Sequence, residues 1–476
     1  MFTPARVKLL VVTCVVLFMA MLDNLVLGVA LPSIQKDLGA SMSDLEWFMN
    51  AYTLGFAVLL IPFSILGESI GRKQVFLGGV VVFTLGSLLS GLSESSLALI
   101  LSRALQGVGG AAVVPLSLTL VNKAFPPDKR AAALGMWSGI SGLGLSIGPL
   151  VGGLIMEGAP WQMIFYVNVP IGVVAFILGL RWLQPSRGVR KPFDPIGVLL
   201  LVSGLFGIVF GLERSNTEGW GSPLIIGSLG GGLALLLLFY VWERTRKTPF
   251  VRFDLFRRKT YSLYVFAGFW MNAGVFGAIF LLTLFLQQAQ GNSPLGAGVR
   301  EMAWTTMTMI AAPLAGLAIN KLGNKNVLVA GLSLQAIALA WFAWLIADRG
   351  ADFGFAYMLA PMMLAGTGMG LSFTPLSHGQ LTSVPEESGG EASGMGNATR
   401  ELGGTFGIAI TGLIFQSGAA VQTPQQFADH IVPSLVASAI MMAVPLAAIV
   451  LFVRGKRANS ASVISAPSSP PAPEGA

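Results

Sequence analysis

The feature that most constrains this chain is a series of apolar runs, each about 20 residues long, that follow one another along most of its length. A helix of that length crosses the roughly 30 Å hydrocarbon core of a bilayer. Because 54% of the 476 residues are hydrophobic and only 11% are charged, a soluble fold could not keep this surface away from water. Inside a bilayer only helices and closed barrels satisfy the backbone, and the alternating pattern of barrel strands is not seen here. We therefore predict an all-α polytopic membrane protein.

The apolar runs divide into fourteen predicted transmembrane helices. The first run begins with Arg6 and Lys8 as a signal peptide would, but it is too long for one and contains Asp23, so we interpret it as an uncleaved span. The predicted spans cover 9–31, 47–67, 74–93, 97–121, 132–156, 162–182, 195–213, 222–243, 262–288, 300–320, 326–347, 354–377, 393–418 and 432–453.

The distribution of Lys and Arg predicts the orientation of these spans. Most basic residues fall in the loops on one side, including 181–191 and 244–259, and short cytoplasmic loops are the ones that collect positive charge. We therefore expect a multi-pass protein of the cell membrane with both termini in the cytoplasm. The same asymmetry accounts for the net charge of +7 without a nucleic-acid partner. The loops on the opposite side contain only Lys36, Arg214, Arg300 and Arg349.

Two short loops resemble each other and indicate an internal duplication. The stretch SILGESIGRK (Ser64–Lys73) follows the second predicted span, and GLAINKLGNK (Gly316–Lys325) follows the tenth. Duplicated halves with a substrate site at their interface are a recurring plan of transporters. We predict a six-helix bundle at 1–190, an inserted helix pair with basic cytoplasmic loops at 191–259, a second six-helix bundle at 260–455 and a disordered cytoplasmic tail at 456–476.

Six motifs stand in order along the chain: LDNLVLGVALP (22–32), WFMNAYTL (47–54), GESIGRK (67–73), RALQGVGGAA (103–112), GLSIGPLVGG (144–153) and NATRELGG (397–404). With these motifs the chain resembles the major facilitator superfamily, and specifically its fourteen-span drug:proton antiporter family. The resemblance extends to about residue 453 and implies two six-helix bundles plus two inserted helices. The chain departs from the family's usual residues at Leu25, Gly28, Ser64, Glu68, Ser69 and Gln162, which leaves the fold expectation intact but weakens any inference about one substrate.

Asp23 is the one acidic residue that we place deep inside an apolar span. An isolated carboxylate in hydrocarbon is costly, so it should face a cavity or a partner. We predict that Asp23 binds a proton and a cationic substrate in turn. The alternative is a side chain that reaches water at the outer third of its span.

Arg103 is a basic residue inside a span, and Gln106 lies on nearly the same helix face. The resemblance links the matching arginine to proton coupling, whereas the alternative is a structural cation bonded to backbone carbonyls. Arg400 and Glu401 belong to the last motif, where they either form a local ion pair or line an inner vestibule; Glu401 is a second candidate for the proton-carrying carboxylate.

The stretch GLSIGPLVGG places Gly144, Gly148 and Gly152 on one helix face, with Pro149 and Gly153 beside them. A face without side chains lets another helix approach closely, and the proline can bend the span. We consider simple packing and a close contact that seals one side between the two halves. The resemblance favours the second, because this motif is associated with antiporters, and it therefore implies export.

Glu68, Gly71, Arg72 and Lys73 form a candidate cytoplasmic gate, in which Arg72 pairs with an acid or with a helix C-terminus in one state and releases it in another. The alternative is a topology signal alone.

Trp47, Tyr52, Asn272 and Phe276 are candidates for a substrate pocket, although aromatic residues in helix bundles usually pack against one another. His378 and His430 fall at membrane edges, and we expect them to be surface residues.

The function that these features favour is proton-driven secondary active efflux of amphipathic, in particular cationic, drugs by alternating access. The partners are then small-molecule substrates, protons and the lipid bilayer, and we expect a functional monomer. Alternatives are an exporter of one metabolite, antibiotic or siderophore, and a membrane sensor or enzyme. The sequence shows no Walker motif and no Cys/His cluster, with Cys14 its single cysteine, so we predict no metal, no cofactor and no enzymatic activity.

Overall fold

The computed structural model describes residues 3–186, 194–246, 249, 251–385, 388–417 and 421–453, and within these ranges it is entirely helical. The predicted tail at 456–476 lies outside the described residues. In chain order the elements are α1 (Pro4–Leu38), α2 (Met42–Ile70), α3 (Arg72–Gly91), α4 (Ser96–Ala124), α5 (Pro127–Gly158), α6 (Met163–Tyr166), α7 (Asn168–Trp182), α8 (Pro195–Glu218), α9 (Pro223–Thr245), the 3₁₀ helix η1 (Phe253–Arg257), α10 (Lys259–Leu284), the π-helical turn η2 (Phe285–Ala289), α11 (Pro294–Leu322), α12 (Asn324–Arg349), α13 (Phe355–Thr382), α14 (Gly389–Phe415) and α15 (Pro424–Phe452).

Twelve of these helices, searched over the described residues, are long and apolar enough to cross a membrane. In that set α6 and α7 make one continuous span, and so do α10 and η2. The other two predicted spans correspond to α5 and α14. Of α5, only Ile147–Gly158 stands out as a shorter apolar helix among the described residues. The first half of α14 carries Glu391, Arg400 and Glu401, which lower its mean hydropathy.

Local sequence chemistry sets where several helices begin. Ser41 and Asp44 form a reciprocal capping box at the start of α2, and Thr423 and Gln426 form another at the start of α15. Proline stands in the first turn of α1, α8, α9 and α11, where its missing N–H leaves no hydrogen bond unmade.

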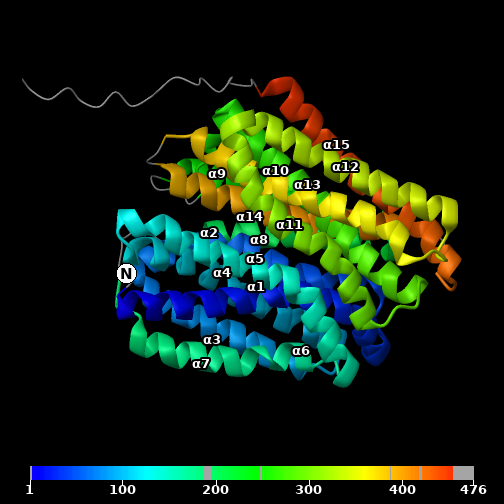
Figure 1. The fold of residues 1–476 in the computed structure, drawn as a ribbon, viewed down its shortest axis with the longest axis horizontal. Coiled ribbons are helices and arrows are strands. Elements are labelled where there is room, and N and C mark those ends of the chain that lie inside the picture. The colour runs from blue at the N-terminus through cyan, green and yellow to red at the C-terminus, as the bar shows by residue number, and fades with distance from the viewer. Residues whose placement is uncertain are drawn as a thin grey trace, which may run out of the picture.

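The helices pack as two groups of roughly parallel rods. In the first group α1 packs against α4, α5 and α7, while α3 and α2 both pack against α4. In the second group α10 packs against α14 and α15, α11 against α13, and α12 against α13 and α15. Figure 1 shows the first group in blue to blue-green below the second in green to red. The main contacts between the groups join α5 to α11 and α2 to α14.

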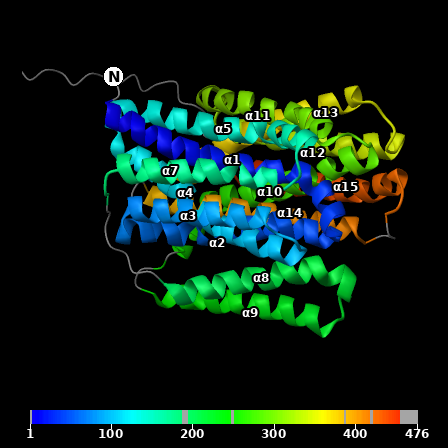
Figure 2. The ribbon, with the colours of Figure 1, turned by 90° about the horizontal axis from the view of Figure 1, so that it is seen from below.

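The helices α8 and α9 pack on each other and form a separate layer. Figure 2 shows them along one edge of the molecule, outside the other helices. Only α8 reaches the rest of the bundle extensively, through α2 of the first group and α14 of the second. The pair therefore sits over a junction between the two groups.

The two similar loops adopt matching structures. Gly71 joins α2 to α3 with φ 139°, and Gly323 joins α11 to α12 with φ 82°, a region of backbone space that favours glycine. Lys73 Nζ donates to the Leu180 carbonyl near the end of α7, at 2.7 Å. Lys325 Nζ donates to the Val450 carbonyl near the end of α15, at 2.8 Å. In each group, the lysine of the similar loop therefore donates to a carbonyl near the C-terminal end of the last helix, α7 or α15.

Candidate functional site

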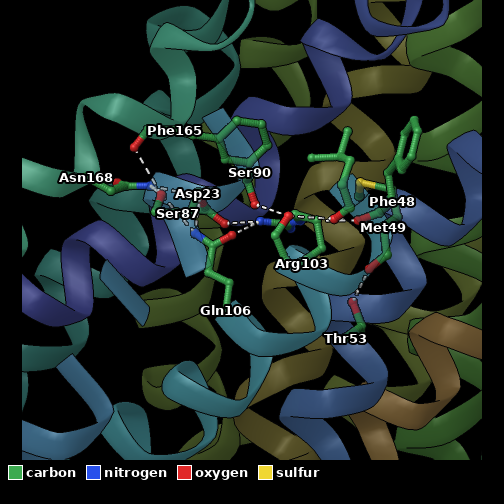
Figure 3. A network of polar contacts seen from close by, with 12 residues as sticks. Asp23, Phe48, Met49, Thr53, Ser87, Ser90, Arg103, Gln106, Phe165 and Asn168 are labelled. Carbon is green, nitrogen blue, oxygen red and sulfur yellow. Dashed lines mark hydrogen bonds and ion pairs between the residues drawn. The ribbon is translucent and has the colours of Figure 1, made fainter. Parts of the chain in front are cut away.

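A buried charge pair lies at the centre of the first group. Arg103 Nη1 on α4 donates to Asp23 Oδ2 on α1 at 2.6 Å. The two side chains are only 1% and 2% exposed. Removing two charges from water is costly, and their attraction offsets that cost only when further hydrogen bonds complete the geometry. Figure 3 shows that such bonds surround the pair.

The second oxygen of Asp23 accepts two amide hydrogen bonds. Gln106 Nε2 and Asn168 Nδ2 each donate to Asp23 Oδ1 at 2.8 Å. Both amides also donate to Ser87 Oγ, at 3.3 and 3.0 Å. Ser87 in turn donates to the Phe165 carbonyl at 3.0 Å (Figure 3). The carboxylate therefore ties together α1, α4 and α7, with α3 contributing the serine.

Arg103 makes four further contacts. Its Nη1 also donates to Gln106 Oε1 at 2.6 Å, and its Nε donates to the Phe48 carbonyl of α2 at 3.2 Å. The guanidinium lies 4.5 Å from the centre of the Tyr52 ring and 5.8 Å from that of Phe165. Cation–π contacts of this kind strengthen when the cation is desolvated. The bond to the Phe48 carbonyl matches the structural alternative considered for Arg103, and the pair with Asp23 is a further contact; the role in proton coupling stays a prediction.

The sequence placed Asp23, Arg103 and Gln106 in the site but missed Asn168 and Ser87. Both are polar residues inside apolar predicted spans and are 0% exposed. That is the signal that could have found them, since a buried polar group in a membrane helix needs a partner. The interpretation of Asp23 as a side chain that reaches water is wrong, because Asp23 is 3% exposed.

The glycine face of α5 packs against α1, within the first group. Cβ atoms added at Gly144, Gly148 and Gly152 would lie 3.1, 3.0 and 3.1 Å from atoms of Met21, Leu25 and Val26, respectively. The predicted four-residue glycine face is therefore a packing surface between neighbours of one group. The expectation that this face seals the contact between the two halves is wrong, because the face packs against α1 of its own group.

Gly153 and Pro149 make the contact between the groups instead. A Cβ at Gly153 would lie 2.5 Å from Leu295 Cα at the start of α11. On α11, a side chain at Gly298 would clash with the Pro149 carbonyl. The backbones of α5 and α11 thus approach each other with glycine on both sides, as small residues allow in membrane helices.

This contact lies at the end of the bundle where α1 joins α2, here called the α1–α2 end. Three hydrogen bonds cross between the groups at the same end. Gln287 Nε2, in the π-helical turn η2, donates to the Val29 carbonyl at 3.0 Å, and Gln288 Nε2 donates to Gln35 Oε1 at 2.7 Å. Gln416 Nε2 donates to Glu46 Oε1 at 2.7 Å. The α1–α2 end is therefore closed by contacts from both groups.

A small cavity lies between the groups next to this closed end. It is lined by Leu25, Pro149, Ile279, Leu282, Glu301, Trp304, Thr305 and Met362. Glu301, on α11, accepts a hydrogen bond from Thr283 Oγ1 of α10. The sequence did not single out Glu301, because it falls at the edge of a predicted span beside Arg300. It supplies a carboxylate at an otherwise largely apolar site.

The candidate gate residues are bonded within the first group. Arg72 donates two hydrogen bonds to the Glu68 carboxylate, at 2.8 Å from Nε and 2.5 Å from Nη2. Its Nη1 donates to Ser186 Oγ at 2.7 Å. Together with the bond from Lys73 to the Leu180 carbonyl, these contacts fix the α2–α3 loop against the C-terminal end of α7. Of the two pairings considered for Arg72, the one with an acid is present, whereas the contact with the C-terminal end of a helix is made by Lys73.

Arg400 and Glu401 form the local ion pair that was one of two alternatives, with Nη2 3.7 Å from Oε1. The side chains are 22% and 17% exposed, so neither is fully enclosed. The Arg400 guanidinium also lies 4.9 Å from the centre of the Phe373 ring on α13.

The four candidate pocket residues do not come together. Trp47 packs against Phe206 of α8, with ring centroids 5.5 Å apart. Tyr52 stacks on Arg103, as described above. Asn272 is 1% exposed on α10, and its Oδ1 has no hydrogen-bond partner. Phe276, also on α10, contacts the backbone at Gly404 of α14. None of the four lines either of the two cavities described here.

A second cavity, of about 290 Å³, lies between the α8–α9 pair and the rest of the bundle. Its lining is almost entirely apolar and includes Ala57, Val58, Ile61, Leu201, Leu236, Phe239, Tyr240, Val251, Phe253, Phe256, Met395, Ala398, Thr399 and Leu402. The described residues contain no cluster of three or more His, Cys, Asp or Glu side chains that could hold a metal ion.

A bundle of membrane-length helices in two packed groups, with a buried ion pair in one group and a cavity between the groups, is the architecture of a multi-pass membrane transporter. The family follows from comparison with known proteins. The model of the Major Facilitator Superfamily matches residues 13–408, and the chain belongs to this superfamily.

Curated relatives match most of the chain. The tetracenomycin C resistance and export protein of Streptomyces glaucescens is 33% identical over 426 residues, which cover 89% of this chain and 78% of that protein. Multidrug resistance protein Stp of Mycobacterium tuberculosis is 34% identical over 407 residues, covering 85% and 75%. The cephamycin export protein CmcT of Amycolatopsis lactamdurans is 32% identical over 448 residues, covering 92% and 91%.

Among solved structures, the fold is similar to a bacterial homologue of the human lysosomal transporter Spinster in an inward-facing, unoccupied conformation. The TM-score is 0.66, with 94% of this chain and 97% of that chain covered. At 16% sequence identity this likeness concerns the fold alone.

Proposed function

We propose that this protein is a fourteen-span, proton-driven antiporter that exports amphipathic compounds, cationic ones in particular, by alternating access. The observation that carries the proposal is the fully buried network of Asp23, Arg103, Gln106 and Asn168. The names of the three relatives describe export or resistance, which supports the outward direction of transport.

The network offers a coupling step. A proton that binds Asp23 removes the negative charge that faces Arg103 at 2.6 Å. Arg103 is 1% exposed and would then be a buried cation without a counter-ion, which is strongly unfavourable. The helices α1 and α4 must therefore rearrange when the proton arrives. Coupling requires that the two conformations of the protein bind the proton with different affinity.

The cationic substrate does not reach Asp23 in this conformation. Both carboxylate oxygens already accept hydrogen bonds, and the side chain is 3% exposed. We therefore assign the proton to Asp23 and place the first substrate contact in the cavity between the groups, where Glu301 supplies a negative charge among apolar residues. Direct competition between proton and substrate for Asp23 would need another conformation.

The closed α1–α2 end fits one state of the transport cycle. In the predicted orientation that end faces the outside, so the contact of Gly153 with Leu295 would close the outer access. The loop from Glu68 to Lys73 lies at the opposite, cytoplasmic end in this orientation and forms the inner gate. We include α5 and α14 among the spans because each runs as long as its neighbours and packs among them.

The remaining assignments follow the same plan. The protein is a monomer in the cell membrane with both termini cytoplasmic, and its bundles comprise 1–190 and 260–455. The segment 191–259, with α8 and α9, is an inserted pair. Its peripheral layer in Figure 2 supports this division.

A second candidate is an exporter of one defined natural product. Two of the relatives are named for single compounds, tetracenomycin C and cephamycin, which favours this alternative. The two candidates differ in substrate range and share the transport mechanism.

One experiment tests the common part. Cells that express the protein are loaded with a cationic dye, and efflux is followed before and after the pH gradient is dissipated. We expect efflux to stop when the gradient is lost, and efflux that continues unchanged would contradict proton coupling. A panel of structurally unrelated amphipathic cations then separates the candidates, because a dedicated exporter would move few or none of them.

A further inference from the structure

A second set of buried carboxylates lies outside the Asp23 network. Glu46 on α2 is 0% exposed and Glu213 on α8 is 1% exposed. Asn50, one turn after Glu46, donates from Nδ2 to Glu213 Oε1 at 2.6 Å. Gln416, directly after α14, donates to Glu46 Oε1 at 2.7 Å. Glu46 lies one residue before the predicted span 47–67, and Glu213 is the last residue of the predicted span 195–213, so the sequence placed neither acid deep inside a span although both are buried.

The cluster contains more acceptors than donors. Glu46 Oε2, Asn50 Oδ1 and Glu213 Oε2 are all buried, and none has a hydrogen-bond partner. A buried acceptor without a donor destabilises the fold, and a charged one does so more strongly. What the site lacks is a hydrogen-bond donor.

No cation is bonded to either carboxylate within the described part of the chain. Arg214 follows Glu213 directly, but it makes no ion pair there, and its Nε is buried without a hydrogen-bond partner. On α4, Arg103 is committed to Asp23 and to the Phe48 carbonyl.

The other charged groups near the cluster have partners of their own. On α15, His430 Nδ1 lies 2.9 Å from the Phe415 carbonyl, next to Gln416. On α2, the Asp44 carboxylate accepts a hydrogen bond from the Ser41 backbone N–H and is not part of the cluster. Arg400 and Glu401, in the middle of α14, pair with each other. Two ionised carboxylates without a bonded cation cannot both be kept this deep without a large penalty.

We propose that Glu46 and Glu213 hold one shared proton and form a second proton-binding site, separate from Asp23, where α2, α8 and α14 meet. The bound proton turns one carboxylate oxygen into an O–H donor. That donor can satisfy one of the three unpaired acceptors, and the pair then carries a single negative charge. The proton comes from water, and no other reactant is needed.

The packing around the pair indicates a built site. A side chain at Gly412 of α14 would clash with the Glu46 carboxylate, so glycine leaves the room that the carboxylate occupies. The site also joins three parts of the molecule, because α2 belongs to the first group, α14 to the second and α8 to the peripheral pair. A proton held here therefore stabilises one of the two main contacts between the groups. This inference does not depend on the proposed export function.

Infrared spectroscopy on the purified, full-length protein tests the proposal directly. A protonated carboxylic acid has a C=O stretching band that an ionised carboxylate lacks. We expect the unmodified protein to show such a band at neutral pH and Glu46→Gln and Glu213→Gln each to lose the same component. Glu218→Gln, at the exposed end of the same helix α8, is the matched control and should keep it. Glu46→Asp retains an acid and should shift the component without removing it.

Thermal stability provides a second readout. The melting temperature of the unmodified protein should fall as the pH rises above neutral and the shared proton is lost, and in Glu213→Gln this fall should shrink, because the amide supplies a donor at every pH. The proposal is overturned if the unmodified protein has no protonated-acid band at neutral pH, or if folded Glu46→Gln and Glu213→Gln keep the whole band. A melting temperature that depends on Na⁺ at constant pH, without the band, would assign the site to a metal cation and overturn it as well.

Discussion

The Asp23 carboxylate accepts hydrogen bonds from three side chains on two other helices, and this fixes what its charge can do. Arg103 holds one oxygen, and the amides of Gln106 and Asn168 hold the other. Each donor offsets part of the cost of burying the negative charge, so loss of any one of them should weaken the network. The network therefore keeps the negative charge of Asp23 compensated inside the bundle.

The Asn168 amide can be removed without altering the Asp23–Arg103 ion pair itself. Asn168→Ala removes the donors to Asp23 Oδ1 and to Ser87. We expect a stability loss of about 1–3 kcal/mol and an altered pH profile of transport, because the carboxylate has lost a hydrogen-bond donor. Transport should be measured in proteoliposomes at a series of pH values. Ser102→Ala, which removes a bond to Ser90 outside the carboxylate's partners, is the control, and an unchanged profile in Asn168→Ala would be evidence against the coupling role.

The stability that the Arg252–Asp254 ion pair contributes, after α9, depends on pH. Arg252 donates to Asp254 at 2.9 and 2.7 Å and to Glu391 at 3.0 Å. The hydrogen bond from Arg252 holds the pKa of Asp254 below its usual value. Its stabilising contribution is therefore present above the unfolded carboxyl pKa and is lost as the pH falls through the lowered folded value.

This contribution is small, because Asp254 is 53% exposed and solvent screens the pair. We expect Asp254→Asn to lower the melting temperature slightly at neutral pH and not at all at strongly acidic pH, where the unmodified residue is also neutral. A difference between the two proteins that grows with acid would contradict this sign.

At the scale of helices, the two faces of α5 have different partners. The face with Gly148 lies against α1, and the face with Gly153 lies against α11 of the other group. Close packing of small residues serves both faces, but only the second can change when the groups move apart. Substitutions on the two faces should therefore have different consequences.

Gly153→Leu should disturb the transport cycle more than the fold. The added side chain would clash with the Leu295 backbone, so we expect the α1–α2 end to open and transport to fall at least tenfold at similar expression. Opening can be measured as increased labelling of a cysteine placed at the start of α11, beside Leu295. Gly139→Ala is the control on the same helix, since its Cβ would meet open space. Full transport with Gly153→Leu would show that the contact does not gate access.

Gly148→Leu presses instead against Leu25 Cβ, which a Cβ at this position would approach to 3.0 Å. The helix pair α1–α5 must separate, and α1 carries Asp23. We expect transport to fall more than membrane expression does, with the α1–α2 end remaining closed to labelling. Equal transport at equal expression would show that the close approach of α1 and α5 is dispensable.

The sequence predicted the helices well and their contacts poorly, for physical reasons. Long apolar runs mark membrane-length helices, because the bilayer sets their length. The partner of a glycine face depends on which helix lies beside it, and sequence spacing does not contain that information. Asp23 and Arg103 were both identified, yet their contact spans 80 residues of chain and was not predictable from either span. Glu46 and Glu213 were missed because α2 and α8 extend past the apolar runs that defined them.

At the scale of the whole molecule, the orientation of the bundle decides which end is the outer gate. The lone cysteine, Cys14, is buried and gives a low background for labelling with impermeant thiol reagents. Arg258→Cys, in the exposed loop before α10, should be labelled only from the cytoplasmic side. Glu218→Cys, at the exposed end of α8, should be labelled only from outside. The opposite result at either position would reverse the topology and with it the assignment of the closed end.

The central claim is that proton exchange at Asp23 drives export, and substrate-induced proton release from purified protein measures it most directly. A pH-sensitive dye in weakly buffered solution reports the protons released when an amphipathic cation is added. The account predicts release from the unmodified protein, loss of most of it in Asp23→Asn, and retention of most of it in Glu401→Gln, since Glu401 already pairs with Arg400 at 3.7 Å. Asp23→Asn that releases protons and exports cations as the unmodified protein does would contradict the account.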